Sequence, residues 1–554
     1  MVRRATVSFL LLFAIAYFPA AEHGLSADSP GGVVLKPKKF TYPGMKDFYN
    51  MVGWLAVPVT SGKPMGSDVA GYYKLYFVME ELPMPAKALG GYEFGRLAAL
   101  VEAPVAGSES DPLSPTGTFT RVPIADDYFT YYDTAIVPAP GTDQLSAVFG
   151  TLREATARSG ETFELDINAY GMQFQNGTLT VGARNTIWTS DPITSSSSSS
   201  FVYLSGYDVV SNRGSMAFYT SWVDTDAGPR GWQAAVTDTS VAALKGENHQ
   251  FHELKPPGGK YQVLSMGGVG YDGTGKYSAI AKVTNYKKGS LEMAPEGNYF
   301  VPDRTTIYSY VWNAFTSPER ADSVLKPTKI ESSEDDLSTP FRDAQFLDGY
   351  STPTSTSTST ARAGAAPAFY MFYQQYQPRT LEPGDLDKYT ITYWLQTLDG
   401  KGKPVGAREQ ITAPAWDHTI SPNPNATVTY YSQTISPMIP INSSSASTSR
   451  PDSRRYVSTQ TRTLRRGSSN RDEVRAAAAQ NTELQVNVLL FDPITKVISQ
   501  LASVQLKYDE GDSVSSAKAL ITGDELLIYY SHYRSKSESS EGYLVKTRLS
   551  DLLP

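Results

Sequence analysis

The chain has 554 residues, no cysteine and a formal net charge of −7 at pH 7. The missing cysteines exclude disulfides, zinc–cysteine sites and iron–sulfur clusters, and the negative charge argues against nucleic acid or an anionic membrane as a partner. Charged residues make up only 19%, whereas Tyr (35), Gly (43) and Pro (36) are abundant. Because aromatic residues suit strands and Gly and Pro mark turns, we expect an all-β protein.

The first residues have the pattern of a secretory signal. Arg3 and Arg4 precede an apolar run over residues 5–18, and small residues follow it. That run is shorter than the roughly 20 residues that a membrane span needs, although an uncleaved anchor is the alternative. We therefore predict a signal peptide and short leader over residues 1–27, and a secreted, extracellular protein with no membrane span after the signal is removed.

One local pattern recurs along the rest of the chain. It consists of a β-forming lead, two adjacent aromatic or apolar residues, and then mostly polar residues. The second position of each pair falls at residues 77, 149, 219, 281, 373, 431 and 530. The intervals of about 60 to 100 residues are typical of a repeat in which each unit contains several strands. Adjacent aromatic residues in a strand point to opposite faces, so both can be buried only if sheets pack on both sides.

The unit that starts near residue 201 shows the strand content of such a repeat. We predict strands over residues 201–204, 216–222 and 232–236, separated by turns rich in Gly, Asn and Asp. The segment Asp272–Gly275 is a further predicted turn. Residues 389–398 form a long predicted strand that ends in Asp399-Gly400, a hairpin signal.

Three low-complexity segments interrupt the repeat, near residues 194–200, 351–366 and 443–480. The first two are rich in Ser and Thr and the third in Ser and Arg, so none has much apolar surface to bury, and we expect disordered loop insertions. Residues 28–554 are accordingly predicted to form a single β-propeller, with seven blades expected and six or eight as alternatives. A pair of β-sandwiches is the other reading of these strands.

The Tyr-Tyr-Ser segments at residues 430–432 and 529–531, and Phe-Tyr-Gln at 372–374, resemble the Tyr-Tyr-Gln strand of fungal fucose-binding lectins. These lectins are secreted propellers that bind sugars between their blades. In the lectins an arginine two residues before the first tyrosine helps to hold the sugar, whereas this chain has Val428, Leu527 or Tyr370 there. The resemblance therefore implies the scaffold and not that fucose site.

Several residues are candidates for binding or modification. Exposed tryptophans can stack on sugars or anchor proteins, and the candidates are Trp222, Trp232, Trp312 and Trp416, each of which could instead belong to the core. Three N-x-S/T triplets mark the glycosylation candidates Asn176, Asn425 and Asn442. The pair Arg465-Arg466 in the Arg-rich segment is a candidate processing site, with a solvated insertion or a patch for an anionic partner as alternatives.

Motifs for catalysis and cofactors are scarce. The chain has no G-x-S-x-G elbow, P-loop or zinc motif, so no catalytic or metal-binding residue is assigned. Asp224 and Asp226 before Gly228 match part of a calcium loop, although a hairpin turn accounts for them as well.

The leading functional prediction is a secreted propeller, not an enzyme, that binds a glycan or an extracellular protein through loops on one face. The alternatives are a propeller glycoside hydrolase acting on extracellular polysaccharide and a structural cell-surface protein. Carboxylates from distant blades could meet at the centre of the ring, so local spacing does not exclude the hydrolase.

Overall fold

The structure is a computed structural model of the 554-residue chain. It describes residues 33–40, 48–58, 73–81, 95–102, 119–129, 131–138, 144–155, 162–175, 178–194, 202–212, 214–224, 228–238, 251–258, 262–294, 297–314, 324–333, 341–347, 367–378, 389–413, 428–441, 455–467, 482–507, 509, 512–514, 517–522, 524–534, 536–537 and 539–553. Within these residues no helix is long and apolar enough to cross a membrane.

The described strands form seven sheets, which we number in chain order. Sheet 1 contains β3 (Phe48–Pro58), β4 (Tyr73–Glu81), β5 (Gly95–Glu102) and β6 (Phe119–Phe129). Sheet 2 contains β7 (Tyr131–Pro138), β8 (Gln144–Ala155), β9 (Thr162–Gln175), β10 (Thr178–Thr189) and β11 (Ile193–Thr194). Sheet 3 contains β12 (Val202–Asn212), β13 (Ser215–Asp224), β14 (Gly228–Asp238), β15 (Phe251–Leu254) and β19 (Val324–Leu325).

The four remaining sheets follow the same plan. Sheet 4 contains β16 (Gln262–Tyr271), β17 (Lys276–Ala294), β18 (Gly297–Asn313) and β20 (Thr328–Ser333). Sheet 5 contains β21 (Phe341–Phe346), β22 (Pro367–Pro378), β23 (Tyr389–Asp399) and β24 (Glu409–Ile411). Sheet 6 contains β25 (Val428–Ile435), β26 (Ile439–Pro440), β27 (Tyr456–Gly467), β28 (Thr482–Asp492), β29 (Val497–Val504) and β1 (Val33–Leu35). Sheet 7 contains β30 (Ser513–Val514), β31 (Lys518–Thr522), β32 (Glu525–Arg534), β33 (Ser539–Arg548) and β2 (Lys38–Phe40).

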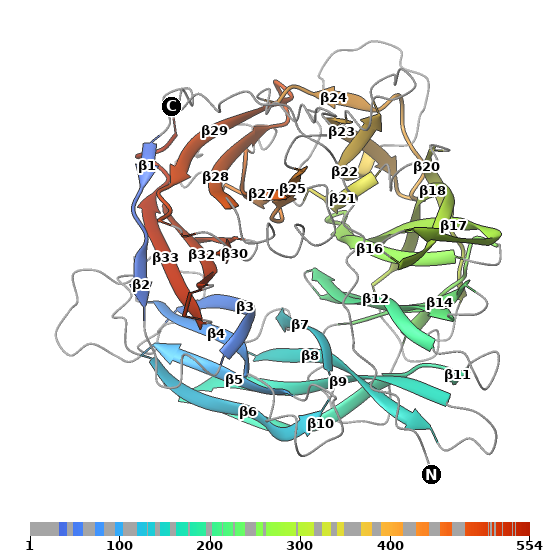
Figure 1. The fold of residues 1–554 in the computed structure, drawn as a ribbon, viewed down its shortest axis with the longest axis horizontal. Coiled ribbons are helices and arrows are strands. Elements are labelled where there is room, and N and C mark those ends of the chain that lie inside the picture. The colour runs from blue at the N-terminus through green and yellow to red at the C-terminus, as the bar shows by residue number, and fades with distance from the viewer. Residues whose placement is uncertain are drawn as a thin grey trace.

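The sheets follow one another around a ring (Figure 1). The strands nearest the middle are β3, β7, β12, β16, β21, β25 and β30, and we call each of them the first strand of its sheet. This arrangement of sheets, which are antiparallel except for the parallel pairs β1–β29 and β15–β19, is a β-propeller and confirms the predicted fold class. The number of sheets among the described residues equals the expected number of blades. For the chain as a whole, the blade number stays a prediction.

The recurring residue pairs lie on equivalent strands in six of these sheets. They occupy the second strand from the middle: β4, β8, β13, β17, β22 and β32. This strand has neighbours on both edges, and on β13, β17, β22 and β32 side chains of both faces are buried. The repeat in the sequence therefore marks a strand that is covered on both faces in these four units.

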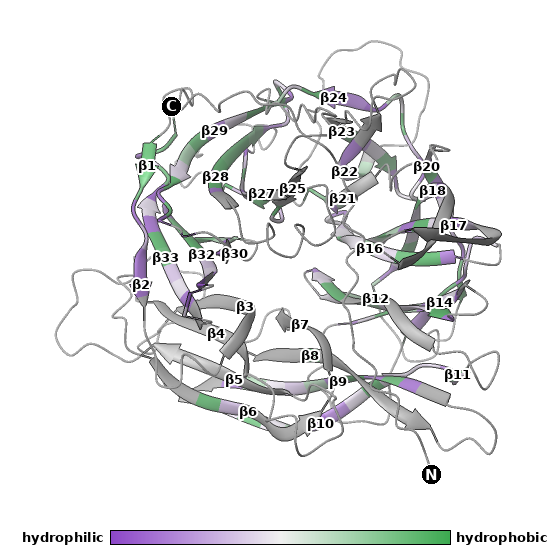
Figure 2. Ribbon diagram, in the orientation of Figure 1, coloured by the Kyte–Doolittle hydropathy of each residue, from purple (hydrophilic) through white to green (hydrophobic). Residues whose placement is uncertain are grey.

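Alternate residues of the second strands enter different inter-sheet cores. On β13, Phe218 packs between sheets 2 and 3, whereas Tyr219 packs between sheets 3 and 4. On β22, Phe372 faces sheet 6 and Tyr373 faces sheet 4. Apolar residues also line β28 and β29 of sheet 6 (Figure 2), where they join the core shared with sheet 7. The prediction that adjacent aromatic residues are both buried is confirmed for these strands.

In sheet 6 the recurring residue pair lies on a different strand from the one it occupies in the other sheets. Tyr431 lies on β25, the first strand, and the second position is taken by β27. That strand covers residues 456–467, so the prediction of a disordered insertion throughout 443–480 is wrong for this part. The strand was missed because its composition is polar. Ser458, Thr459 and Gln460 are fully buried although their side chains are polar. The segments 195–200 and 351–366 lie outside the described residues.

The predicted turns are confirmed where they are described. Residues 272–275 join β16 to β17, and the Asp272 carboxylate accepts hydrogen bonds from the backbone N–H groups of Thr274 and Lys276 at 2.7 and 3.0 Å. Gly273 and Gly275 have φ of 83° and 106°, a conformation that favours glycine. The turn after β23 is closed in the same manner by Asp399, which accepts from Lys401 and Lys403 at 2.8 and 2.9 Å.

Sheets 4 and 5 approach each other closely where β16 meets β21. A Cβ atom at Gly267 would collide with the backbone carbonyl oxygen of Ala344, and one at Gly270 would lie 2.5 Å from Cγ of Phe346. Neither glycine has a positive φ, so close packing is the reason for both residues.

Replacing Gly267 with alanine should therefore destabilise the protein. The added methyl group meets rigid backbone, so we expect the free energy of unfolding to fall by about 1–3 kcal/mol, measured by urea denaturation. Gly171→Ala is the matched control, because no atom lies within 4 Å of its added Cβ. Equal effects of the two substitutions would contradict the close approach.

Candidate functional site

The structure places the predicted tryptophans differently from one another. Trp232 and Trp312 are 4% exposed and belong to the core between sheets 3 and 4, where Trp312 stacks on Tyr277 with ring centroids 5.8 Å apart. Trp222 is half-buried on β13, beside Gly231. Trp416 lies outside the described residues. Packing accounts for Trp232 and Trp312, and a binding role for the four stays a prediction.

The calcium candidate Asp224 already has a cationic partner. Its side chain is fully buried, and its Oδ2 atom accepts hydrogen bonds from Nε and Nη2 of Arg230 at 3.3 and 3.2 Å. A buried carboxylate requires such a partner, which explains Asp224 without a metal ion. Asp226 lies outside the described residues, so the calcium site stays a prediction.

The modification candidates are only partly described. Asn176, Asn425 and Asn442 lie outside the described residues. Arg465 and Arg466 lie on β27, where their backbones pair with Tyr430 and Thr429 of β25. A protease needs an extended, unpaired substrate backbone, so cleavage at this pair would require the end of β27 to separate first.

A cluster that sequence reasoning missed lies between sheets 4 and 5. Trp394 on β23 packs against the core of this interface, and the guanidinium carbon of Arg408 lies 4.0 Å from the centroid of the indole ring. The indole Nε1 donates a hydrogen bond to Oγ1 of Thr392 at 2.9 Å, which holds the ring in place. Arg408 is thus fixed on an aromatic face, where it gains a cation–π interaction.

The Arg408 guanidinium gathers polar groups from two sheets. Its Nη1 atom donates to the phenolic oxygen of Tyr373 at 3.2 Å and to Oε1 of Gln375 at 2.9 Å, both on β22. The same atom lies 3.4 Å from Oε2 of Glu331 on β20 of sheet 4. The side chains of Arg408 and Glu331 are 27% and 30% exposed, so solvent reaches the cluster.

Burial raises the pKa of Tyr373 to about 12, even though the hydrogen bond and charge of Arg408 act in the opposite direction. The phenol is therefore protonated at neutral pH and serves as a hydrogen-bonding group, not as a nucleophile. The cluster contains one cation and one carboxylate, and among its described members Glu331 is the only carboxylate. The usual pair of carboxylates of a glycosidase is therefore not found among the described members of this cluster.

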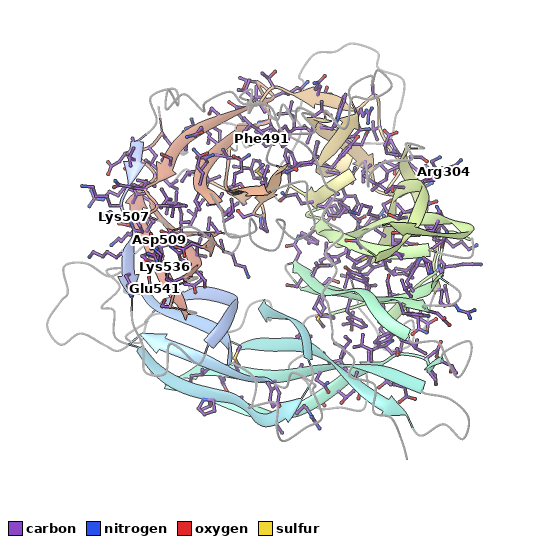
Figure 3. All side chains as sticks on the ribbon, in the orientation of Figure 1. Arg304, Phe491, Lys507, Asp509, Lys536 and Glu541 are labelled. Carbon is purple, nitrogen blue, oxygen red and sulfur yellow. The ribbon has the colours of Figure 1, made fainter. Side chains whose placement is uncertain are left out.

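A second charged cluster joins the N-terminal strand β2 to sheet 7. The Nζ atom of Lys39 lies 2.5 Å from Oε1 of Glu541. The Oε2 atom of Glu541 accepts hydrogen bonds from the Tyr543 hydroxyl at 2.6 Å and from Nε of Arg534 at 3.2 Å. Arg534 also donates to Asp512 at 3.0 Å, and Asp512 lies 3.0 Å from Nε2 of His532. Figure 3 shows Glu541 near Lys507, Asp509 and Lys536 on this side of the ring.

The pKa shifts of Tyr543 and His532 in this second cluster do not produce an active nucleophile. Burial and the Glu541 carboxylate raise the pKa of Tyr543, so the phenol stays protonated. Burial and the charge of Arg534 lower the pKa of His532, outweighing the effect of Asp512. β1 pairs with β29, and β2 pairs with β33, so residues 33–40 connect sheets 6 and 7 (Figure 1). We interpret this cluster as a clasp for the N-terminal strands.

Comparisons with known proteins assign no family to this chain. No family model and no curated protein match the chain. Similar solved structures include the polysaccharide lyase Uly1, with TM-score 0.37, 9% identity, and coverage of 86% of this chain and 88% of that chain. The β-propeller domain of the Trilobed protease from Pyrococcus furiosus has TM-score 0.25 and 9% identity, with coverage of 76% and 96%. A thermostable family-43 glycoside hydrolase has TM-score 0.25 and 10% identity, with coverage of 63% and 90%. These TM-scores assign no activity to this chain.

The local signals for the Arg408 cluster are weak. Trp394 lies in a correctly predicted strand, next to Tyr393, and could have been selected as a tryptophan at the end of an aromatic run. Arg408 lies in a polar segment and Glu331 in another sheet, and nothing local connects either residue to Trp394. Their proximity depends on the packing of sheet 4 against sheet 5.

Arg408→Lys should weaken the cluster, because an ammonium group cannot stack flat on Trp394 while bonding Tyr373 and Gln375. We expect the free energy of unfolding to fall by about 1 kcal/mol, measured by chemical denaturation. Lys496→Ala is the control: its 2.7 Å ion pair with Glu409 is exposed, and we expect almost no change. An Arg408→Lys variant as stable as the control would show that the stacked geometry is not maintained in solution.

The clasp should make stability depend on pH. An unfolded His532 takes up a proton near pH 6.5, whereas the folded one does so only at lower pH, so acidification below pH 6.5 destabilises the fold. Glu541, whose pKa is lowered to about 2 by Lys39, Tyr543 and Arg534 against the effect of burial, adds a second loss below its ordinary value of 4.5. The thermal midpoint should fall between about pH 7 and pH 5, and less steeply in His532→Gln. Parallel profiles for both proteins would contradict this role of His532.

Proposed function

We propose that this protein is a secreted, non-enzymatic propeller that binds a glycan at the Arg408–Glu331 cluster. The observation that carries the proposal is the guanidinium held between an indole face and the polar groups of two sheets, with solvent access. A planar donor, a carboxylate, an amide and a phenol are fixed there by surrounding bonds. Such preorganised polar groups bind vicinal hydroxyls without a large cost of ordering side chains.

The balance of charge indicates the class of glycan. Arg408 and Glu331 together carry no net charge, so an acidic sugar would gain from the arginine and lose to the neighbouring carboxylate. A neutral sugar can accept hydrogen bonds from the guanidinium and donate to Glu331 and Gln375. We therefore propose neutral glycans as the ligands. Secretion is proposed from the basic and apolar pattern of residues 3–18.

A glycan-array screen of the purified protein, run with a hydrolysis assay on the same sugars, tests this function. We expect binding of neutral glycans, no released products, and affinity lower by about tenfold in Glu331→Gln, which loses one charged acceptor. Lys496→Ala should bind as the unaltered protein does, because its ion pair with Glu409 does not belong to the cluster. Binding unaffected by Glu331→Gln and Arg408→Ala would remove the cluster as the site, and released products would favour the glycoside hydrolase.

A further inference from the structure

The interface between sheets 5 and 6 has an aromatic end. Phe372 on β22 and Phe491 on β28 have ring centroids 5.8 Å apart, and Tyr456 lies 6.3 Å from Phe491. Figure 3 labels Phe491 on sheet 6. These rings belong to one buried cluster shared by the two sheets. The aromatic end is therefore well packed.

Four amide side chains continue the same interface away from these rings. Gln374 follows Phe372 by two residues on β22, so it faces sheet 6 as well. Asn487 shares the Phe491 face of β28, and Gln460 pairs with Asn487 in the ladder. Gln500 pairs with Leu489, a member of the shared cluster. The interface thus changes from aromatic to neutral and polar along the strands.

Gln374, Gln460 and Asn487 are buried and Gln500 is half-buried, and all four have incomplete hydrogen bonding among the described residues. Within the described part of the chain, no hydrogen-bond partner is found for either amide atom of Gln374, or for Nε2 of Gln460, Oδ1 of Asn487 and Nε2 of Gln500. One bond joins the group: Nδ2 of Asn487 donates to Oε1 of Gln460 at 3.0 Å. Gln374, Gln460 and Asn487 are 0% exposed. Buried polar groups without partners favour any state in which water reaches them.

Contacts between the two sheets hold the aromatic end together. The backbone N–H of Met438 donates to Oε1 of Gln345 at 2.7 Å. At the outer strands, Thr412 donates to the carbonyl oxygen of Lys496 at 2.8 Å, and Ile498 donates to that of Thr412 at 2.7 Å. These bonds lie on the side of Phe491 and can act as a hinge.

We infer that sheets 5 and 6 part reversibly at the amide end and admit water to Gln374, Gln460, Asn487 and Gln500, while the aromatic end stays joined. Opening gives each unpartnered amide atom a water molecule, which offsets part of the cost of exposing apolar neighbours. Gln396 lies on the opposite face of sheet 5, toward sheet 4. Its Nε2 atom already donates a hydrogen bond to the carbonyl oxygen of Thr397 at 2.9 Å, so this atom would gain no new hydrogen bond if water entered there.

The absence of cysteine from the chain permits a direct test. Gln374→Cys and Gln396→Cys place one thiol on each face of sheet 5, at positions that are 0% and 5% exposed. Both proteins are treated with a water-soluble maleimide under native conditions, after circular dichroism has confirmed folding. We expect the thiol at 374 to react about tenfold faster or more, because the unpartnered amide atoms gather at its interface and favour opening there. Equal or slower reaction at 374 would overturn the inference.

Hydrogen exchange of the unaltered protein gives a second measurement that does not depend on a variant. Peptides covering residues 458–461 and 485–488 should exchange faster than peptides covering residues 279–284 of β17, which lie in the cores that sheet 4 shares with sheets 3 and 5. Equal protection of these segments would contradict reversible opening. Neither measurement involves a glycan, so its outcome is independent of the proposed binding function.

Discussion

The structure depends on the burial of both faces of each sheet by its neighbours. A sheet that is covered on one side only would expose half of its second strand, where Phe218 and Tyr219, or Phe372 and Tyr373, point in opposite directions. The ring arrangement removes this exposure for every unit at once. Close approaches such as that of Gly267 to Ala344 are a consequence, because adjacent sheets must pack without gaps.

Enclosure also forces the buried polar groups to find partners within the ring. Some do so across an interface: Oγ of Ser221 accepts from the backbone of Leu264 at 2.7 Å and joins sheet 3 to sheet 4. Asp224 does so within its own sheet, through Arg230. Among the described residues, the amides around Gln374 remain incompletely bonded, as do single groups elsewhere, such as the indole Nε1 atoms of Trp232 and Trp312 between sheets 3 and 4.

The same packing creates the candidate site. Trp394 and Arg408 belong to sheet 5 and Glu331 to sheet 4, so the cluster exists only when the two sheets are in place. The clasp at Lys39 and Glu541 depends likewise on strands from opposite parts of the sequence, and β1 and β2 extend sheets 6 and 7 with residues 33–40. The candidate site therefore lies at a boundary between two units, and residues 33–40 connect two others.

The sequence by itself determined the fold class, the strands around Phe218, Phe372 and Tyr529, and the turns at Asp272 and Asp399, because alternation and turn residues are local properties. It did not identify β27, whose buried Ser, Thr and Gln side chains resemble those of an exposed loop. Only the tertiary structure decided which residues meet between sheets. Arg408 and Glu331 are brought together by the order of strands in space, and no local spacing records that order.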